Sequence, residues 1–183
     1  MTAGSRNIRI EQGSTLVVPM FLRSTVEVGT TPVRVGRAVP HVKNPGPSEV
    51  WFGADDTVTP LTGTLVPVGE VVEVSPAADV WLVSDVDEAV ARVPMDLTGY
   101  AARMQIRPRV SSDTELLELT SEDGGIVIDG PSGQLTLFAT DSQTSDLSFR
   151  TAVYDIEIVS PAPESYVTRV LQGKVTLSPE VTR

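Results

Sequence analysis

The single histidine of the chain, His41, lies between Pro40 and Val42 in a run of residues typical of a strand. Catalysis by a Ser-His-Asp triad would need a nucleophile and an orienting acid beside it, and no nucleophile motif adjoins His41. The chain has no cysteine, so a zinc site would have to combine one imidazole with carboxylate or water ligands. We therefore expect a structural or surface histidine, no catalytic residue and no metal site.

Three acidic stretches could supply oxygen ligands to a cation. Asp55 and Asp56 would point to opposite faces of a strand, although in a loop they could chelate an ion together with Thr57. Residues 84–88 (SDVDE) and 121–125 (SEDGG) have oxygen ligands without the spacing of a calcium-binding loop. Solvated turns are the simpler interpretation of all three stretches, and we expect no cofactor.

Aromatic side chains are scarce. Paired carboxylates also occur in glycosidases, but the chain has only two tryptophans and three tyrosines with which to line a glycan cleft. Trp51 and Trp81 could bind a sugar, yet packing in a core or at an interface is the simpler interpretation. We take Trp51, Phe52 and Trp81 as candidate interface residues and regard an enzyme as the least favoured class.

Arg103 and Arg107 share the polar face of a predicted strand, close to Arg109. No aromatic residues interleave them, as a nucleic-acid-binding strand would require. The net charge of −10 also opposes binding to bare nucleic acid or to an anionic membrane. Arg103 and Arg107 are therefore further interface candidates, expected to pair with acidic neighbours or with a partner subunit.

The composition predicts an all-β protein. Val and Thr are abundant, Gly and Pro number 14 each, and helical periodicity is scarce. A chain of 183 residues can bury one or two cores. No segment approaches the roughly 20 apolar residues of a spanning helix, and the polar first residues lack the apolar run of a signal peptide. We expect synthesis and folding in a cytosol.

Alternating apolar and polar residues place the strands. Residues 95–108 (MDLTGYAARMQIRP) predict a turn followed by a strand with one apolar face. In residues 15–23, Val17 and Phe21 oppose an apolar face, so we expect both faces of that strand to be covered, with Pro19 at an edge or bulge. Residues 85–94 are interpreted as one helical turn or a connecting strand, with a connector favoured, and residues 141–149 as a single helical turn.

Two antiparallel β-sandwich modules are predicted, one inserted in a hairpin loop of the other. The outer module comprises residues 1–23 and 95–183, and the inserted module comprises residues 24–94, which several prolines divide into short strands. A long insertion in a hairpin is tolerated because closure entropy grows slowly with loop length. The two ends of the insertion must then lie close together.

Several motifs occur in series: IRIEQGSTLVVPMFLR, DLTGYAARMQIRP, LLELTSEDGGIVID, GQLTLFATDSQT, VYDIEIVSP and VTRVLQGKVTLSPEVTR. In this order they resemble small tailed-bacteriophage virion proteins, and are similar to the N-terminal attachment domain of phage baseplate upper proteins. Residues 24–94 depart from that pattern. They resemble, more loosely, another small phage β-sandwich through NPGP, a tryptophan-containing strand and PVGE.

The resemblance implies a structural role in a virion, in a tail, baseplate or fibre-attachment adaptor, with no catalytic residue to transfer. It implies assembly with other virion proteins and with copies of itself, without membrane or direct nucleic-acid contact. Localisation would be the virion, and the host cytoplasm before assembly. Two alternatives stay open: a capsid decoration protein on the head, distinguishable by copy number, and a receptor- or glycan-binding module, distinguishable by sugar affinity.

Overall fold

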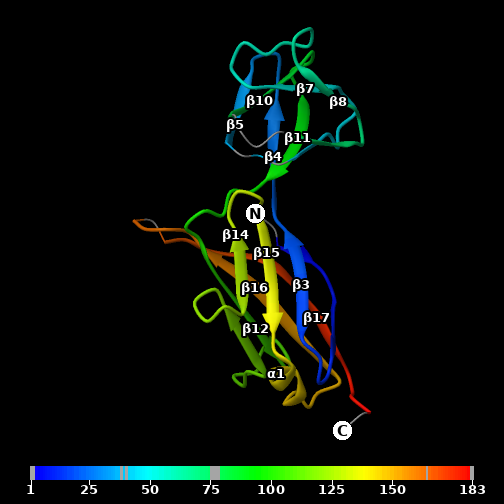
Figure 1. Cartoon of the computed structure of the whole chain (residues 1–183), viewed down its shortest axis with the longest axis vertical. Coiled ribbons are helices and arrows are strands. Elements are labelled where there is room, and N and C mark those ends of the chain that lie inside the picture. Colours follow the sequence, from blue (N-terminus) through cyan, green and yellow to red (C-terminus); the bar gives the residue numbers. More distant parts are fainter. Residues whose placement is uncertain (1–2, 38, 40, 75–78, 164, 182–183) are drawn as a thin grey trace. The chain divides into compact units, whose positions relative to one another are not determined.

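The computed structural model describes residues 3–37, 39, 41–74, 79–163 and 165–181. Within these ranges the chain forms seventeen strands and one α-helix of five residues (Figure 1). The prediction of an all-β protein is therefore confirmed, and most strand pairs are antiparallel. None of the helical residues described forms a segment long and apolar enough to cross a membrane.

The chain divides into two compact units. The first unit comprises Met1–Met20, Gly99–Ile128 and Gln134–Arg183, and the second comprises Phe21–Thr98 and Asp129–Gly133. The sequence-based domains, residues 1–23 with 95–183 and residues 24–94, stay a prediction.

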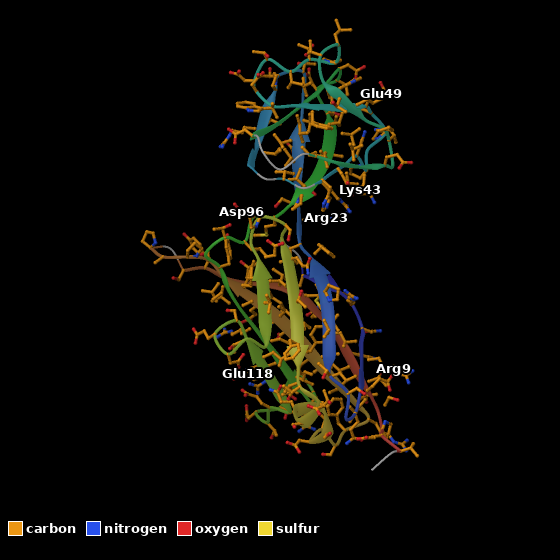
Figure 2. The ribbon with its side chains drawn as sticks, viewed as in Figure 1. Arg9, Arg23, Lys43, Glu49, Asp96 and Glu118 are labelled. Carbon is orange, nitrogen blue, oxygen red and sulfur yellow. The ribbon has the colours of Figure 1, made fainter. Side chains whose placement is uncertain are left out.

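A six-stranded sheet forms one layer of the first unit. Its strands, in spatial order, are β1 (Gly4–Ser5), β17 (Val167–Ser178), β16 (Thr151–Val159), β12 (Ala101–Arg107) and β13 (Leu117–Thr120), and β2 (Ile8–Glu11) also pairs with β17. Alternation decides which face is buried: Ala102, Met104 and Ile106 of β12 point inward, as predicted. Arg9 on β2 and Glu118 on β13 lie at opposite edges of this sheet (Figure 2).

Glycine allows the N-terminal strands to approach β17. β1 and β2 both pair parallel with β17, and between them Arg6 N–H donates to Gln172 O at 3.0 Å. A Cβ atom at Gly173 would overlap the carbonyl oxygen of Arg6. Tyr154 Oη donates to the same oxygen at 2.7 Å, and burial raises the pKa of Tyr154 to about 12.

A three-stranded sheet follows the order β14 (Ile126–Asp129), β15 (Gln134–Ala139) and β3 (Leu16–Phe21). Helix α1 (Asp141–Ser145) comes next and begins with a capping box, in which Thr140 Oγ1 accepts from Gln143 N–H and the Gln143 side chain accepts from Thr140 N–H. The helical turn predicted here is confirmed. Thr144 anchors it, because its buried hydroxyl donates to Ser14 O at 2.8 Å.

The second unit contains two four-stranded sheets. One has the order β5 (Val33–Arg37), β10 (Asp79–Ser84), β7 (Val50–Gly53) and β8 (Thr64–Val66), and the other β4 (Arg23–Val28), β11 (Ala89–Pro94), β6 (His41–Lys43) and β9 (Val71–Glu73). Buried residues of both sheets form one hydrophobic cluster that includes Val42, Ala91, Val50 and Leu82. Burial of this apolar surface holds the two sheets together.

The two ends of residues 24–94 are paired with each other. Arg23 is in register with Pro94, and Met95 N–H donates to Leu22 O at 3.0 Å. Arg23 and Asp96 accordingly lie close together (Figure 2). The expectation that these ends meet is confirmed, whereas the assignment of residues 24–94 to an inserted sandwich stays a prediction.

Of the two interpretations of residues 85–94, a helical turn or a connecting strand, the structure contains the strand: it is β11, whose small apolar residues Ala89, Ala91 and Val93 alternate inward. A different local prediction was wrong. The outer residues of β3 are not covered: Val17 is 58% exposed and Phe21 53% exposed. β3 is the last strand of its sheet among the described residues and has only one packed face, which also confirms the edge position predicted for Pro19.

Candidate interaction surfaces

The two tryptophans lie on one face of the sheet β5–β10–β7–β8 in the second unit. Trp81 on β10 is opposite Gly53 on β7, and Trp51 on β7 is opposite Val83. Because side chains alternate along a strand, Trp51 and Trp81 point away from the core cluster, and both are half-buried. Phe52, between them in the sequence, points the other way and packs against that cluster.

A loop partly covers the tryptophan face. Val58, in the loop between β7 and β8, is buried, and a Cβ atom at Gly53 would lie 2.7 Å from its side chain. A Cβ atom at Gly63 would crowd both Val58 and Trp51, so both glycines allow the loop to fold onto the sheet. Arg34, opposite Trp81, forms an ion pair with Asp79 at 2.9 Å. The remaining exposed aromatic surface is a candidate contact for a partner.

Arg103 lies on the solvent-facing side of the six-stranded sheet in the first unit, where charged residues of adjacent strands pair across it. Its Nε and Nη2 atoms both donate to Glu157 Oε2, at 2.9 and 2.6 Å. Arg169 on β17 binds Asp155 Oδ2 at 2.9 Å. The pairing with acidic neighbours expected for Arg103 is confirmed.

Arg107 organises the loop that follows its own strand. Its Nη1 donates to Ser112 O at 2.7 Å, and its Nη2 binds Glu115 Oε1 at 2.9 Å and Gln105 Oε1 at 2.8 Å. These bonds tie residues 108–116 to β12. Because the guanidinium group of Arg107 already makes these bonds within the first unit, it has less capacity to bind a phosphate group.

A concavity of about 430 Å³ lies on this charged side. Its walls carry the paired groups just described, together with two glutamines, and the residues that define it are Arg103, Gln105, Asp155, Glu157, Arg169 and Gln172. Opposite charges alternate across it, so the concavity offers hydrogen-bonding groups without a strong field of either sign. Its chemistry suits a polar protein contact.

His41 lies beside a second concavity of about 390 Å³ in the second unit, which Arg23 and Glu73 also line. His41 is in register with Glu73. Its Nε2 atom is buried and makes no hydrogen bond among the described residues. Burial lowers the pKa of His41, the charge of Arg23 lowers it further, and Glu73 raises it. A protonated imidazole is therefore disfavoured here.

The acidic stretches form turns. Asp55 Oδ1 accepts hydrogen bonds from the Thr57 hydroxyl and N–H, which lower the pKa of Asp55. Asp123 accepts from the N–H groups of Gly125 and Thr120 in the same way, and its pKa is also lowered. In residues 84–88, Asp87 accepts from the Thr30 hydroxyl at 2.8 Å. The described part of the chain holds no group of three or more acidic or histidine side chains placed for a metal ion.

An apolar surface that was not predicted from the sequence lies on the outer side of the sheet β14–β15–β3. Val17, Val127 and Phe138 of the first unit are 58, 57 and 40% exposed there, and Pro19 is also exposed. Alternation places them opposite the buried side chains of the same strands. This surface was not predicted because both faces of β3 were expected to be covered.

No protein-family model matches the chain, and a search of curated proteins finds no match either.

Proposed function

We propose that the chain is a structural component of a tailed-bacteriophage virion, a tail, baseplate or fibre-attachment adaptor that acts through protein–protein assembly. The observation that carries this proposal is the ordered series of motifs that resembles the attachment domain of baseplate upper proteins. Those motifs supply all the strands of the first unit except β1, namely β2, β3 and β12–β17. The likeness thus extends over consecutive parts of one compact unit.

The exposed surfaces support an assembly role. Monomeric proteins rarely leave several large apolar side chains together on one sheet face unless a partner covers them. Val17, Val127 and Phe138 form such a group. A chain that acts by being held among neighbours needs surfaces of this kind.

The test is to locate and count the protein in purified particles of the phage that encodes it. An antibody label seen by electron microscopy is expected at the tail, with on the order of a dozen copies per particle, arranged in closed rings. Hundreds of copies on the head would instead indicate a decoration protein. Absence of the chain from particles would contradict the proposal altogether.

The receptor-binding alternative is tested separately on the purified chain. A glycan array, followed by calorimetry on any sugar that binds, would reveal affinity that Trp51→Ala or Trp81→Ala abolishes. We expect no such affinity, because Val58 and its loop restrict the aromatic surface that a sugar ring could stack on. Specific binding lost in both variants would favour the glycan-binding function over the adaptor.

A further inference from the structure

In the second unit, no described strand lies beside the outer edge of β4. β4 is the first strand of its sheet, and among the described residues it pairs with β11 alone. The hydrogen bond from Met95 N–H to Leu22 O marks a closely bonded pair just before the strand. Because such pairs recur at every second residue, Ser24, Val26 and Val28 bond to β11.

The backbone groups of the intervening residues, Arg23, Thr25 and Glu27, therefore point to the outer edge. Their side chains are also exposed, since burial in β4 alternates with the same period. The edge thus presents both a row of backbone donors and acceptors and a row of solvent-facing side chains.

The charges on this edge are self-complementary. The strand reads Arg-Ser-Thr-Val-Glu-Val from residue 23, so a two-fold axis through Thr25 would place Arg23 opposite the partner's Glu27. The second contact of the pair, Glu27 opposite the partner's Arg23, follows from the symmetry. Neither Arg23 nor Glu27 has an ion-pair partner within the described residues.

We infer that β4 is an interface for a second copy of this chain, which adds its own β4 antiparallel and joins the two sheets into one. In this register the outward backbone groups of Arg23, Thr25 and Glu27 face those of the partner's Glu27, Thr25 and Arg23. Each of these three pairs exchanges two backbone hydrogen bonds, about six in all. Addition of a strand to a free edge is a common mode of recognition. The inference does not depend on a role in a virion.

The charges also exclude other ways of pairing the two edges. A parallel, in-register pair would bring Arg23 beside the partner's Arg23 and Glu27 beside the partner's Glu27, and like charges directly opposite are destabilising. An antiparallel pair shifted by two residues would leave one or both charges without a partner. The two ion pairs therefore select a single register.

Two other sheet edges, those of β3 and β13, are less suited to strand addition. Successive backbone N–H groups of a strand point to opposite edges. Leu22 N–H bonds to Gly133 O on the inner side of β3, so position 19, three residues earlier, faces the outer edge. Pro19 has no N–H, and the outer edge of β3 therefore lacks a donor there. Arg6 Nη1 occupies the Pro19 carbonyl at 3.1 Å. In β13, the Thr120 N–H bonds to Asp123 Oδ1. Such features protect edges against pairing, and β4 carries none of them.

Sedimentation equilibrium of the full chain tests the interface, at concentrations from about 10 μM to 1 mM because an edge contact buries little area. We expect a monomer–dimer equilibrium. Glu27→Arg and Arg23→Glu should each weaken it about tenfold, since each variant replaces two attractive pairs with two repulsive ones. Glu88→Arg, at an exposed turn residue between β10 and β11, changes the net charge as Glu27→Arg does and should leave the dimer unaffected.

Charge exchange distinguishes loss of the interface from misfolding. An equimolar mixture of Glu27→Arg and Arg23→Glu pairs each charge with its opposite, so the mixture should dimerise as the wild type does. The double variant Arg23→Glu with Glu27→Arg should also dimerise. In hydrogen exchange, the amides of Thr25 and Glu27 should become more protected as the concentration rises.

A wild-type chain that stays monomeric throughout this range would overturn the inference. So would a dimer that tolerates both single substitutions, or one that neither the mixture nor the double variant restores. None of these results bears on the location of the protein in a particle, so the proposed function would stand or fall on its own test.

Discussion

At the scale of single residues, Gly173 lies where the backbone of Arg6 approaches β17 too closely for any side chain. Gly173→Ala would force the N-terminal strands away from β17 and weaken the Tyr154–Arg6 hydrogen bond. We expect the free energy of unfolding to fall by about 1–3 kcal/mol, in the range of overpacked sites. Urea denaturation followed by circular dichroism measures it.

Gly29→Ala is the matched control for this change. The nearest atom to a Cβ there is Asp87 Oδ1 at 3.7 Å, an ordinary contact. The substitution should alter the unfolding free energy by no more than about 0.5 kcal/mol. Equal losses in the two variants would contradict the steric account of Gly173.

His41 predicts a pH dependence of stability. Its pKa is lower in the folded chain than the ordinary value of 6.5, so the unfolded chain binds the proton more readily. The neutral imidazole therefore contributes stability that is complete above pH 6.5 and is lost as the pH falls from 6.5 through the folded pKa. Arg23 and Glu73 are the charged groups facing it, and Glu73 opposes the effect.

The measurement is direct because the chain contains a single histidine. One imidazole proton resonance, followed by NMR, should titrate below pH 6.5 in the folded chain and near 6.5 in urea. The His41→Gln variant should lack the decrease in stability between pH 7 and pH 5.5. A folded pKa above 6.5 would refute the prediction.

Sequence reasoning could predict the ion pairing of Arg103 but not its partner. The alternation of apolar and polar residues in 100–107 predicts that Arg103 and Arg107 lie on the solvent-facing side of the strand. This can be predicted because alternation is a local pattern in the sequence. The partner Glu157 comes from a strand distant in sequence, so its identity depends on the pairing register. The Nε2 atom of His41 is buried without a hydrogen bond among the described residues. Its burial likewise depends on packing by residues that no local pattern identifies.

At the scale of elements, the sheet β14–β15–β3 predicts opposite responses from two neighbouring residues. Ile126 is buried and Val127 is 57% exposed. Ile126→Ala should cost about 2–5 kcal/mol of unfolding free energy, whereas Val127→Thr should change it by about 0.5 kcal/mol or less because Thr retains the strand preference. Equal costs, measured by urea denaturation, would mean that a further layer covers Val127.

The strands themselves were largely predictable, and their partners were not. β12 and β16 follow from alternation, since every second residue of each is buried. β1 has only two residues and no periodicity, and it exists because Gly173 admits the backbone beside β17. The exposure of Val17 follows from the uncovered outer face of the sheet β14–β15–β3, where Val127 and Phe138 are also exposed, and no local pattern shows whether a face is covered.

At the scale of the whole molecule, the pairing of Arg23 with Pro94 predicts that the segment between them can be removed. Replacement of residues 24–94 by Asn-Gly leaves Arg23-Asn-Gly as a three-residue hairpin loop between Leu22 and Met95, with Gly at the position that favours a left-handed backbone. The shortened chain should retain a β-sheet spectrum and unfold cooperatively in urea. The physical reason is that Leu22 and Met95 are already joined by a backbone hydrogen bond.

Deletion of residues 101–107 is the control for that experiment. It removes β12, which lies between β13 and β16, and should abolish cooperative unfolding. If the chain without residues 24–94 also failed to fold, the prediction that this segment is an insertion would be wrong.

The parallel pairing of β2 with β17 determines the order in which the chain can fold during synthesis. Ile8 and Ile10 are synthesised long before the strand beside which they lie, which contains Val175 and Leu177. Until that strand is made, those isoleucines stay exposed to water, although every strand of the sheets containing β4 and β5 has by then emerged. The nascent chain therefore carries an unfinished, aggregation-prone first unit until β17 is made, and a chaperone that binds such chains would bind there.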